Sequence, residues 1–193
     1  SMIIGQSGSG KTVFLKCLLG LHKHEKGSII FDGKDYADLN DKEHRQLRQE
    51  MGMVFQGGAL YDSLTIEENV MFPLKMFTNN SFGEMLERVN TVLKRVNLEN
   101  VNNKFPAELS GGMQKRVAIA RAIVMNPKYL FCDEPNSGLD PNTATIIDNL
   151  IQEITKEYQM ITIINSHDMN SVMEIGEKIV FLKNGVKAWE GTN

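Results

Sequence analysis

The sequence has few of the features that mark secreted or membrane-spanning proteins. It contains 2 cysteines and 1 tryptophan among 193 residues. Cys17 and Cys132 lie in apolar segments, so we expect both thiols to be reduced and structural rather than joined in a disulfide. No apolar run approaches the roughly 20 residues that span a bilayer, and no signal peptide is visible. These absences predict a cytoplasmic protein.

A surplus of positive charge is missing as well. The chain has 21 Lys and Arg residues against 24 Asp and Glu residues, a formal net charge of −3. Because nucleic-acid binding requires a basic surface, we expect no nucleic-acid partner. The hydrophobic content of 41% and the charged content of 23% are ordinary for a globular chain. A chain of this length accommodates one domain with a core of its own.

A phosphate-binding motif stands close to the first residue. Residues 5–12 read Gly-Gln-Ser-Gly-Ser-Gly-Lys-Thr, the spacing of a P-loop. Its glycines let successive backbone N–H groups point into one concavity, and the helix expected from about residue 11 to 19 adds its positive end. The apolar residues 2–4 predict the preceding strand, which argues against a chance match. The residues expected to bind phosphate are Gly5, Gln6, Ser7, Gly8, Ser9, Gly10, Lys11 and Thr12.

An acidic pair completes the expected nucleotide site. Residues 129–132 are wholly apolar, as in a parallel strand covered on both faces, and they end in Asp133-Glu134-Pro135. Lys11 suits the β- and γ-phosphates, while Thr12 and Asp133 suit Mg²⁺. Glu134 is placed to orient or deprotonate a water molecule. The alternative, an acidic turn ended by a proline, loses weight beside a P-loop.

A second glycine-rich segment, Leu-Ser-Gly-Gly-Met-Gln at 109–114, precedes a helix expected from about residue 113 to 125. It has no lysine and no Mg²⁺ ligand of its own. Two chains that pair head to tail with two-fold symmetry would each complete the other's pocket. A plain N-cap at Ser110 is the simpler alternative, and the two roles are compatible.

The order of these motifs resembles that of the nucleotide-binding domain of ABC transporters. The resemblance covers almost the whole chain, and the segment 109–114 is highly specific. It implies an ATPase that uses ATP and Mg²⁺, with Glu134 as the catalytic carboxylate and His167 as the switch histidine at the γ-phosphate. Gln56 would be the Q-loop glutamine, which senses Mg²⁺, water and the membrane partner, and would join Thr12 and Asp133 at the metal. Across an ATP-dependent homodimer interface, the resemblance implies roles for Asp140, Ser110, Gly111 and Gly112.

The predicted fold is an α/β P-loop NTPase with an ABC-type, RecA-like core. Strands near 128–132, 160–165 and 178–182 alternate with helices near 141–157 and 169–176, which predicts a doubly wound parallel sheet. Between about 57 and 126 the strand pattern disappears, and residues 84–96 have helical spacing. We therefore expect a single domain over residues 1–193, with a core of about 1–56 and 127–193 and an inserted α-helical subdomain of about 57–126.

The P-loop lies nearer to residue 1 than is usual in ABC domains, where about 30 residues and an adenine-stacking aromatic residue come first. We therefore expect this chain to lack the N-terminal strands of such domains. No residue here is assigned to the adenine, and missing strands would leave a sheet edge open.

The segment after Gln56 suggests a subfamily. Residues 57–65 read Gly-Gly-Ala-Leu-Tyr-Asp-Ser-Leu-Thr, which is similar to the ATPases of Mce-type lipid transport systems, including the Mla phospholipid system. This resemblance implies a separate membrane permease, a Mce-domain or lipid-binding component, and a location on the cytoplasmic face of the inner membrane. Apolar residues of segment 57–82, among them Tyr61 and Phe72, are expected to form a groove for a permease helix. The alternative is an ABC ATPase of a different importer or exporter, with a generic turn at the two glycines.

Non-transport ABC-type ATPases are a further alternative. Chromosome-maintenance and DNA-repair ATPases carry long coiled-coil arms, and too few residues separate Gln56 from Ser110 to hold them. Glu134 and His167 argue against a catalytically inert regulatory module. A translation-associated ABC factor would need two such domains in one chain.

Overall fold

The sheet that carries the site is built mainly from parallel strands. The structure, a computed structural model, describes residues 1–192, so the domain predicted over 1–193 is described up to its last residue but one. Six strands pair in the order β4-β5-β6-β1-β7-β8; the first five run parallel and β8 pairs antiparallel with β7. Their bounds are β1 Met2–Ile4, β4 Met51–Val54, β5 Tyr129–Asp133, β6 Ile161–Ser166, β7 Lys178–Lys183 and β8 Val186–Thr192.

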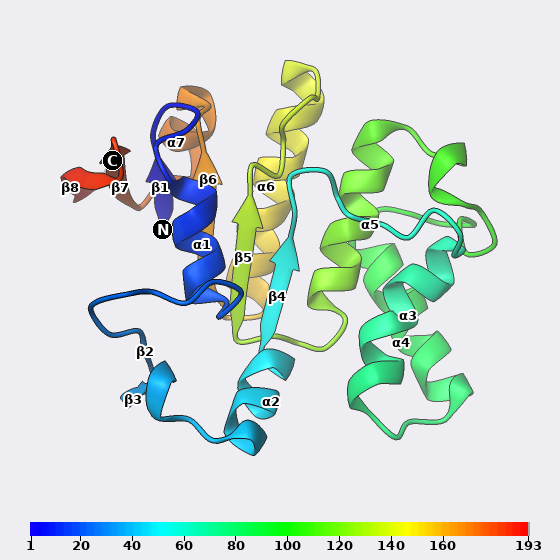
Figure 1. The fold of residues 1–193 in the computed structure, drawn as a ribbon. Coiled ribbons are helices and arrows are strands. Elements are labelled where there is room, and N and C mark those ends of the chain that lie inside the picture. Colours follow the sequence, from blue (N-terminus) through cyan, green and yellow to red (C-terminus); the bar gives the residue numbers. More distant parts are fainter. Residues whose placement is uncertain (193) are drawn as a thin grey trace.

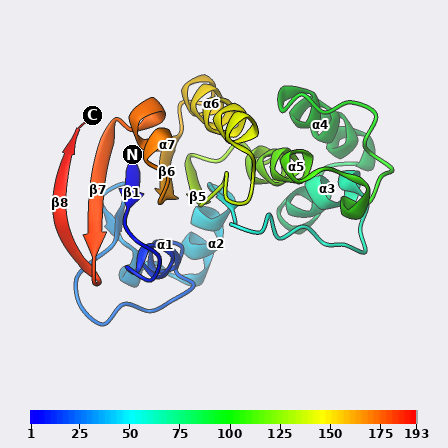
Figure 2. The ribbon, with the colours of Figure 1, turned by 90° about the horizontal axis from the view of Figure 1, so that it is seen from above.

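Helices cover both faces of this sheet. Seen from above, α1 (Lys11–Leu18) and α2 (Asp41–Gln49) lie on one face, and α6 (Pro141–Glu157) and α7 (Met169–Ile175) lie on the other (Figure 2). Parallel strands require such crossover helices. Every residue of β5 is consequently buried, as a strand covered on two faces should be. The predicted doubly wound α/β fold is confirmed.

A helical subdomain stands beside β4, at the opposite end of the sheet from β8 (Figure 1). Its helices are α3 (Ile66–Phe77), α4 (Phe82–Arg95) and α5 (Gly111–Ile123). The sequence pattern predicted α4 and α5 but not α3, which contains Pro73 in its interior, where proline normally disfavours a helix. The signal that could have revealed α3 is its capping box, in which Thr65 and Glu68 satisfy each other's backbone N–H groups.

The region between α1 and β4 contributes no strand to the main sheet. Within it, β2 (Ile30–Phe31) pairs with β3 (Lys34–Asp35) in a separate hairpin. Helix α2 begins at Asp41, after a 3-10 turn at Tyr36–Asp38. The start is set by Asn40, whose side chain accepts from the backbone N–H groups of residues 42 and 43. A second 3-10 turn, Pro106–Glu108, precedes α5.

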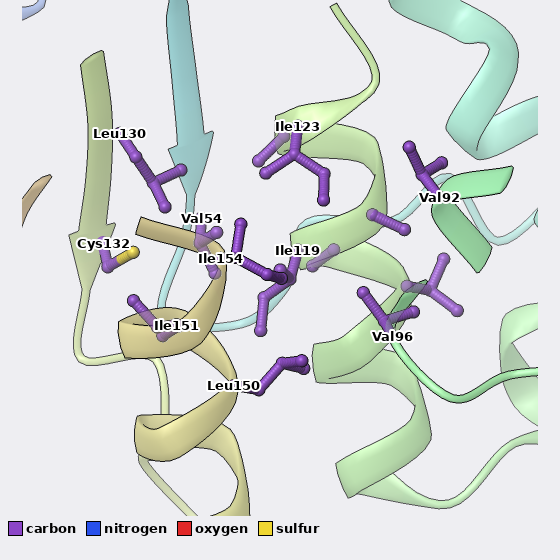
Figure 3. Close-up of a cluster of buried hydrophobic side chains, with 14 of the residues drawn as sticks. Val54, Val92, Val96, Ile119, Ile123, Leu130, Cys132, Leu150, Ile151 and Ile154 are labelled. Atoms are coloured by element: carbon purple, nitrogen blue, oxygen red, sulfur yellow. The ribbon is translucent and has the colours of Figure 1, made fainter. Parts of the chain in front are cut away.

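One continuous core joins the helical subdomain to the sheet. Side chains of α5 and α6 meet between β4, β5 and α4 (Figure 3). The members from α5 and α6 with no measurable exposure include Ile119, Ile123, Ile151 and Ile154. Cys132 is buried in the same core and Cys17 is half-buried, and both are free thiols as expected. None of the helices within residues 1–192 has the length and apolar character needed to cross a membrane.

Shortening a side chain in this core should lower stability. Ile151→Ala removes buried methyl groups between α6 and the sheet, and we expect the free energy of unfolding to fall by about 2–5 kcal/mol. The matched control on the same helix is Ile146→Ala, because Ile146 is 57% exposed; its cost should stay within about 0.5 kcal/mol. Urea denaturation of both variants measures the difference. Equal losses would contradict the assignment of Ile151 to the core.

Candidate functional site

The P-loop connects the carboxyl end of β1 to the first turn of α1. Gly10 caps α1 with a φ of 99°, in the left-handed region that suits glycine. At Gly5 a side chain would have no room, since an added Cβ would lie 2.4 Å from the Leu182 carbonyl oxygen. The loop therefore takes its tight course against the end of β7 because glycine stands at these two positions.

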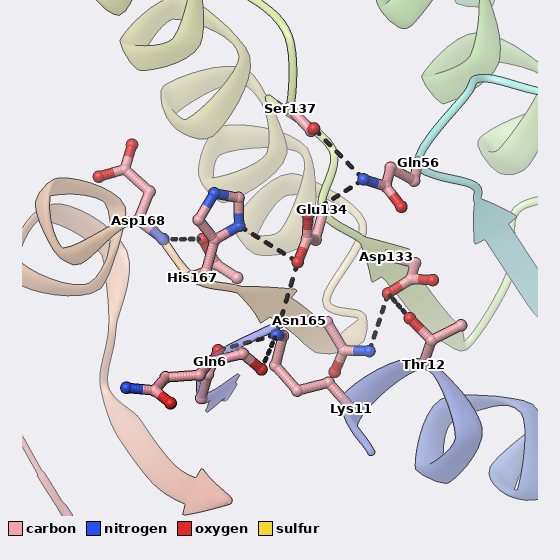
Figure 4. Close-up of polar contacts among 12 residues, drawn as sticks. Gln6, Lys11, Thr12, Gln56, Asp133, Glu134, Ser137, Asn165, His167 and Asp168 are labelled. Atoms are coloured by element: carbon pink, nitrogen blue, oxygen red, sulfur yellow. Dashed lines mark hydrogen bonds and ion pairs between the residues drawn. The ribbon is translucent and has the colours of Figure 1, made fainter. Parts of the chain in front are cut away.

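Lys11 is folded into the loop that precedes it. Its side chain is only 5% exposed, and Nζ donates to the carbonyl oxygens of Gly5 at 2.8 Å and Gln6 at 3.2 Å (Figure 4). Nζ also lies 3.5 Å from Glu134 Oε1. A buried ammonium group requires such partners. The predicted phosphate-binding lysine and the predicted catalytic carboxylate are therefore direct neighbours.

Asp133 brings two segments together at the end of the sheet. The Thr12 hydroxyl donates to Asp133 Oδ1 at 3.1 Å, and Asn165 Nδ2 donates to the same oxygen at 3.0 Å. Asp133 and Asn165 are register partners in the parallel pair β5–β6. Because parallel strands end at the same edge, these polar groups collect there.

Glu134 occupies the centre of the site in a left-handed backbone conformation, with a φ of 46°. This conformation is uncommon for a residue with a side chain. It is held because the Glu134 N–H donates to the Asn165 carbonyl at 2.9 Å. The carboxylate then meets Gln56 Nε2 at 3.2 Å and His167 Nδ1 at 3.2 Å (Figure 4). The three residues expected to be catalytic therefore make direct contacts.

The remaining predicted residues are helix caps outside this cluster. Ser110 Oγ accepts from the Met113 N–H and begins α5, with Gly111 and Gly112 in the first turn. Asp140 Oδ1 accepts from the Thr143 N–H and begins α6; hydrogen bonding from the Thr143 side chain, and then from its backbone, lowers the pKa of Asp140. The cap at Ser110 matches the simpler interpretation of that residue, and the roles of all four residues at a dimer interface stay predictions.

Three further residues hold the cluster and were missed by sequence reasoning. Asn165 bonds Asp133, and Ser137 Oγ accepts from Gln56 Nε2 at 3.4 Å. Lys115, on α5, is 7% exposed, and its Nζ donates to the Gln56 carbonyl oxygen. Burial lowers the pKa of Lys115, and the Glu134 charge opposes that shift. For Asn165 the sequence offered one signal, a polar residue at the end of a predicted strand. Ser137 and Lys115 had no such signal, because each contacts a residue far away in the chain.

The cluster encloses a cavity of about 240 Å³. Its lining includes P-loop residues, Gln56 and Glu134, and does not include Ser110, Gly111, Gly112 or Asp140. Ser9 Oγ is buried in the loop without a hydrogen-bond partner among residues 1–192, and Ser9 is not part of this lining. Within the described residues no three His, Cys, Asp or Glu side chains gather to hold a metal. The Thr12 hydroxyl and the Asp133 carboxylate, 3.1 Å apart, offer oxygens that suit Mg²⁺, which commonly takes one or two protein oxygens together with phosphates.

Comparisons with known proteins agree with this geometry. A family model described as "ABC transporter" matches residues 1–137. Methionine import ATP-binding protein MetN of Clostridium tetani is 44% identical over 180 residues, which cover 93% of this chain and 56% of that protein. A probable ribonucleotide transport ATP-binding protein, mkl, of Mycobacterium leprae is 39% identical, and the match covers 94% of this chain and 52% of that protein. The chain thus spans about half the length of these curated relatives.

Solved structures show the same fold. The ATP-binding cassette MJ0796, dimeric in a post-hydrolysis state with ADP and Pi bound, superposes with a TM-score of 0.88 at 36% identity. The match covers 99% of this chain and 84% of that one. The protein cbiO1 from Clostridium perfringens, part of the ABC transporter complex cbiONQ, superposes with a TM-score of 0.88 at 34% identity, covering 99% and 76% of the two chains.

The position of Lys11 leads to a binding prediction. Lys11→Ala removes the one buried ammonium group of the P-loop, and we expect the Kd for MgATP to rise by about 10²-fold, the equivalent of about 3 kcal/mol of charged contacts. Lys16→Ala, in the last turn of the same helix, is the control and should change the Kd less than about twofold. Isothermal titration calorimetry on both variants tests this. An unchanged Kd for Lys11→Ala would remove Lys11 from the binding site.

Proposed function

The chain belongs to the ABC transporter family, and from this membership we propose that it is the ATP-binding and ATP-hydrolysing subunit of an ABC importer with a separate membrane permease. The observation that carries the proposal is the position of the Glu134 carboxylate, within 3.5 Å of Lys11, Gln56 and His167 side chains. We further propose a core over about 1–56 and 127–193 and a helical subdomain over about 57–126.

The residue roles follow from the contacts around Glu134. Lys11 and the P-loop N–H groups bind the β- and γ-phosphates of ATP. Thr12, Asp133 and Gln56 hold Mg²⁺, which when bound neutralises charge on the phosphate oxygens. Glu134 orients a water molecule and accepts its proton while the water oxygen bonds to the γ-phosphorus and the bond to the ADP oxygen breaks. His167, 58% exposed at the rim, contacts the γ-phosphate.

A homodimer completes the second half of each site. Ser110, Gly111 and Gly112 present the N-terminus of α5 outside the P-loop cavity, where an anion is favoured. In our proposal they bind the γ-phosphate held by the partner, and Asp140 crosses the same interface. The dimeric form of MJ0796 supports this arrangement for a chain with the same fold.

For the transported substrate, the relatives favour a small solute over a lipid. The MetN proteins are named for methionine import, with 40–44% identity in Clostridium tetani and Clostridioides difficile. We therefore propose amino-acid import, at the cytoplasmic face of the plasma membrane. Lipid transport by a Mce- or Mla-type system, with its lipid-binding component, rests only on the residues 57–65 and is kept as the second candidate.

The permease docks, in this proposal, at an apolar groove of about 410 Å³ between the core and the helical subdomain. Tyr61 and Phe72 line it with ring centroids 5.1 Å apart, and Tyr61 is 47% exposed. Arg121 supports this wall by donating to the carbonyl oxygens of Gly58 and Ala59, both at 2.8 Å. Other apolar residues of the segment, such as Met71 and Leu74, are buried inside the subdomain. A groove of this kind suits the apolar face of a short helix.

Replacing the proposed catalytic carboxylate should separate binding from turnover. In the full-length protein assembled with its permease, Glu134→Gln keeps the shape of the side chain and removes the base, so kcat for ATP should fall by about 10²–10⁴-fold. ATP binding should persist, and the dimer should become stable in MgATP by light scattering. Glu153→Gln, at an exposed position on α6, is the control. Wild-type turnover by Glu134→Gln would reject the catalytic assignment.

A charge placed in the groove should uncouple the permease. Tyr61→Asp and Phe72→Asp put a carboxylate among apolar side chains, so we expect loss of co-purification with the permease while the Kd for MgATP stays within about twofold. Phe82→Asp is the control, because Phe82 is 57% exposed and does not line the groove.

Transport assays on the same complexes identify the transported substrate. Methionine uptake into proteoliposomes that carry the wild-type complex is the expected result, and it should be lost in the groove variants. Phospholipid transfer without amino-acid uptake would favour the second candidate.

A further inference from the structure

A buried polar triad includes one residue of the loop that carries Glu134 and takes no part in the contacts described above. It consists of Asn136, Asp148 and Ser171, which are 8%, 2% and 2% exposed. Asn136 belongs to the loop between β5 and α6, Asp148 to α6, and Ser171 to α7. The three residues come from separate segments, so the triad is made by the fold and not by local sequence.

Hydrogen bonds join the three side chains of the triad to one another. Asn136 Nδ2 donates to Asp148 Oδ2 at 3.0 Å and to Ser171 Oγ at 2.8 Å. The Ser171 hydroxyl donates to the same Asp148 oxygen at 2.5 Å. Asp148 Oδ1 is buried and has no partner among residues 1–192. A half-satisfied buried carboxylate lowers stability relative to an apolar residue of similar size, so stability alone does not explain it.

The three positions are spaced around the catalytic groups. Asn136 follows Glu134 by two residues and precedes the Asp140 cap of α6 by four. Ser171 lies in α7, which begins directly after His167 and the Asp168 cap. The triad therefore joins the loop that carries Glu134 to α7, which begins two residues after His167. The Glu134–His167 contact at 3.2 Å spans the same two segments.

We propose that the Asn136–Asp148–Ser171 triad is a positioning device for hydrolysis, which holds the loop 134–140 against α7 and so sets the Glu134–His167 geometry. The inference rests on the proposed ATPase function and deepens it. None of the three side chains contacts the cavity around Lys11, so their effect acts through Glu134 and His167. Distances between catalytic groups matter because small displacements lower turnover strongly.

The negative charge on Asp148 strengthens the hydrogen bonds of the triad. Burial raises the pKa of Asp148 to about 6; the hydrogen bonds from Ser171 and Asn136 oppose this, and the Asp168 and Glu174 carboxylates add to it. On the β5 side Asp148 interacts with the Cys132 thiol, whose own pKa is raised first by burial and then by the Asp148 charge. Above about pH 6 Asp148 is therefore ionised, and a charged acceptor makes the stronger hydrogen bonds. Below that pH the triad is neutral and holds the loop less firmly.

The first test compares two buried hydroxyl groups in the full-length protein assembled with its permease. Ser171→Ala removes one donor of the triad. Thr162→Val removes the 2.7 Å contact between Thr162 and Thr155, which links β6 and α6 at the other end of the strand. We expect Ser171→Ala to lower kcat about three- to tenfold, the kinetic equivalent of one hydrogen bond, with KM for ATP within about twofold. Thr162→Val should lower Tm by about as much as Ser171→Ala does, but should leave kcat within about twofold of the wild-type value.

The second test uses pH. Asp148→Asn keeps an acceptor oxygen and the shape of the side chain but cannot ionise. The ratio of its kcat to the wild-type kcat cancels the titration of every other group. We expect this ratio to be about one third or less near pH 8, where wild-type Asp148 is charged, and to rise towards about 1 near pH 5, where it is neutral.

The outcomes separate this inference from the proposed function. A wild-type complex without ATPase activity would reject the proposed function itself. An active wild type with equal kcat losses in Ser171→Ala and Thr162→Val would show a merely structural triad, and a ratio for Asp148→Asn that is constant with pH would exclude the charged form. Either of these two results overturns the inference and leaves the ATPase assignment intact.

Discussion

The parallel register between β5 and β6 is the constraint on which the site depends. It sets Asp133 beside Asn165, and the Asn165 carbonyl then accepts from the Glu134 N–H. Because β1 pairs with the other edge of β6 in the same direction, the P-loop leaves the sheet at that edge too. A shift of one residue would turn each of these side chains to the opposite face of the sheet. The chemistry thus follows from strand order and register.

Glu134 is constrained both in its backbone and in its side chain. Its backbone is held in a left-handed conformation that costs about 1–3 kcal/mol where the surroundings do not support it. The hydrogen bond to Asn165 and the turn to Ser137 support that conformation, and its carboxylate reaches Lys11, Gln56 and His167. Glu134 thus combines an uncommon backbone conformation with contacts to charged and polar side chains, which is typical of functional sites.

Helix α5 connects this centre to the helical subdomain. Its buried residues include Ile119 and Ile123, which pack in the common core, while its N-terminus carries Ser110 and the two glycines. Lys115 on the same helix contacts the Gln56 backbone. The helix whose N-terminus we propose to bind phosphate is therefore in contact with Gln56, which follows the groove residue Phe55 in the chain. This contact connects the proposed permease groove to the proposed nucleotide site.

The sequence by itself determined the local features of this protein. The P-loop, the Asp133-Glu134 pair and the caps at Ser110 and Asp140 are short motifs whose physics is contained in neighbouring residues. The alternation of strands and helices could also be predicted, because the spacing of apolar residues along the chain indicates which residues are buried. The tertiary structure alone decided the rest. The contacts of Asn165 with Asp133, of Lys115 with Gln56, and of Asp148 with Asn136 and Ser171 join residues far apart in the chain. Little in the local sequence marks Asn165, Lys115 or Asp148 as functional. Each acquires its role only in the folded protein, where packing excludes water and a residue distant in sequence becomes its hydrogen-bond partner.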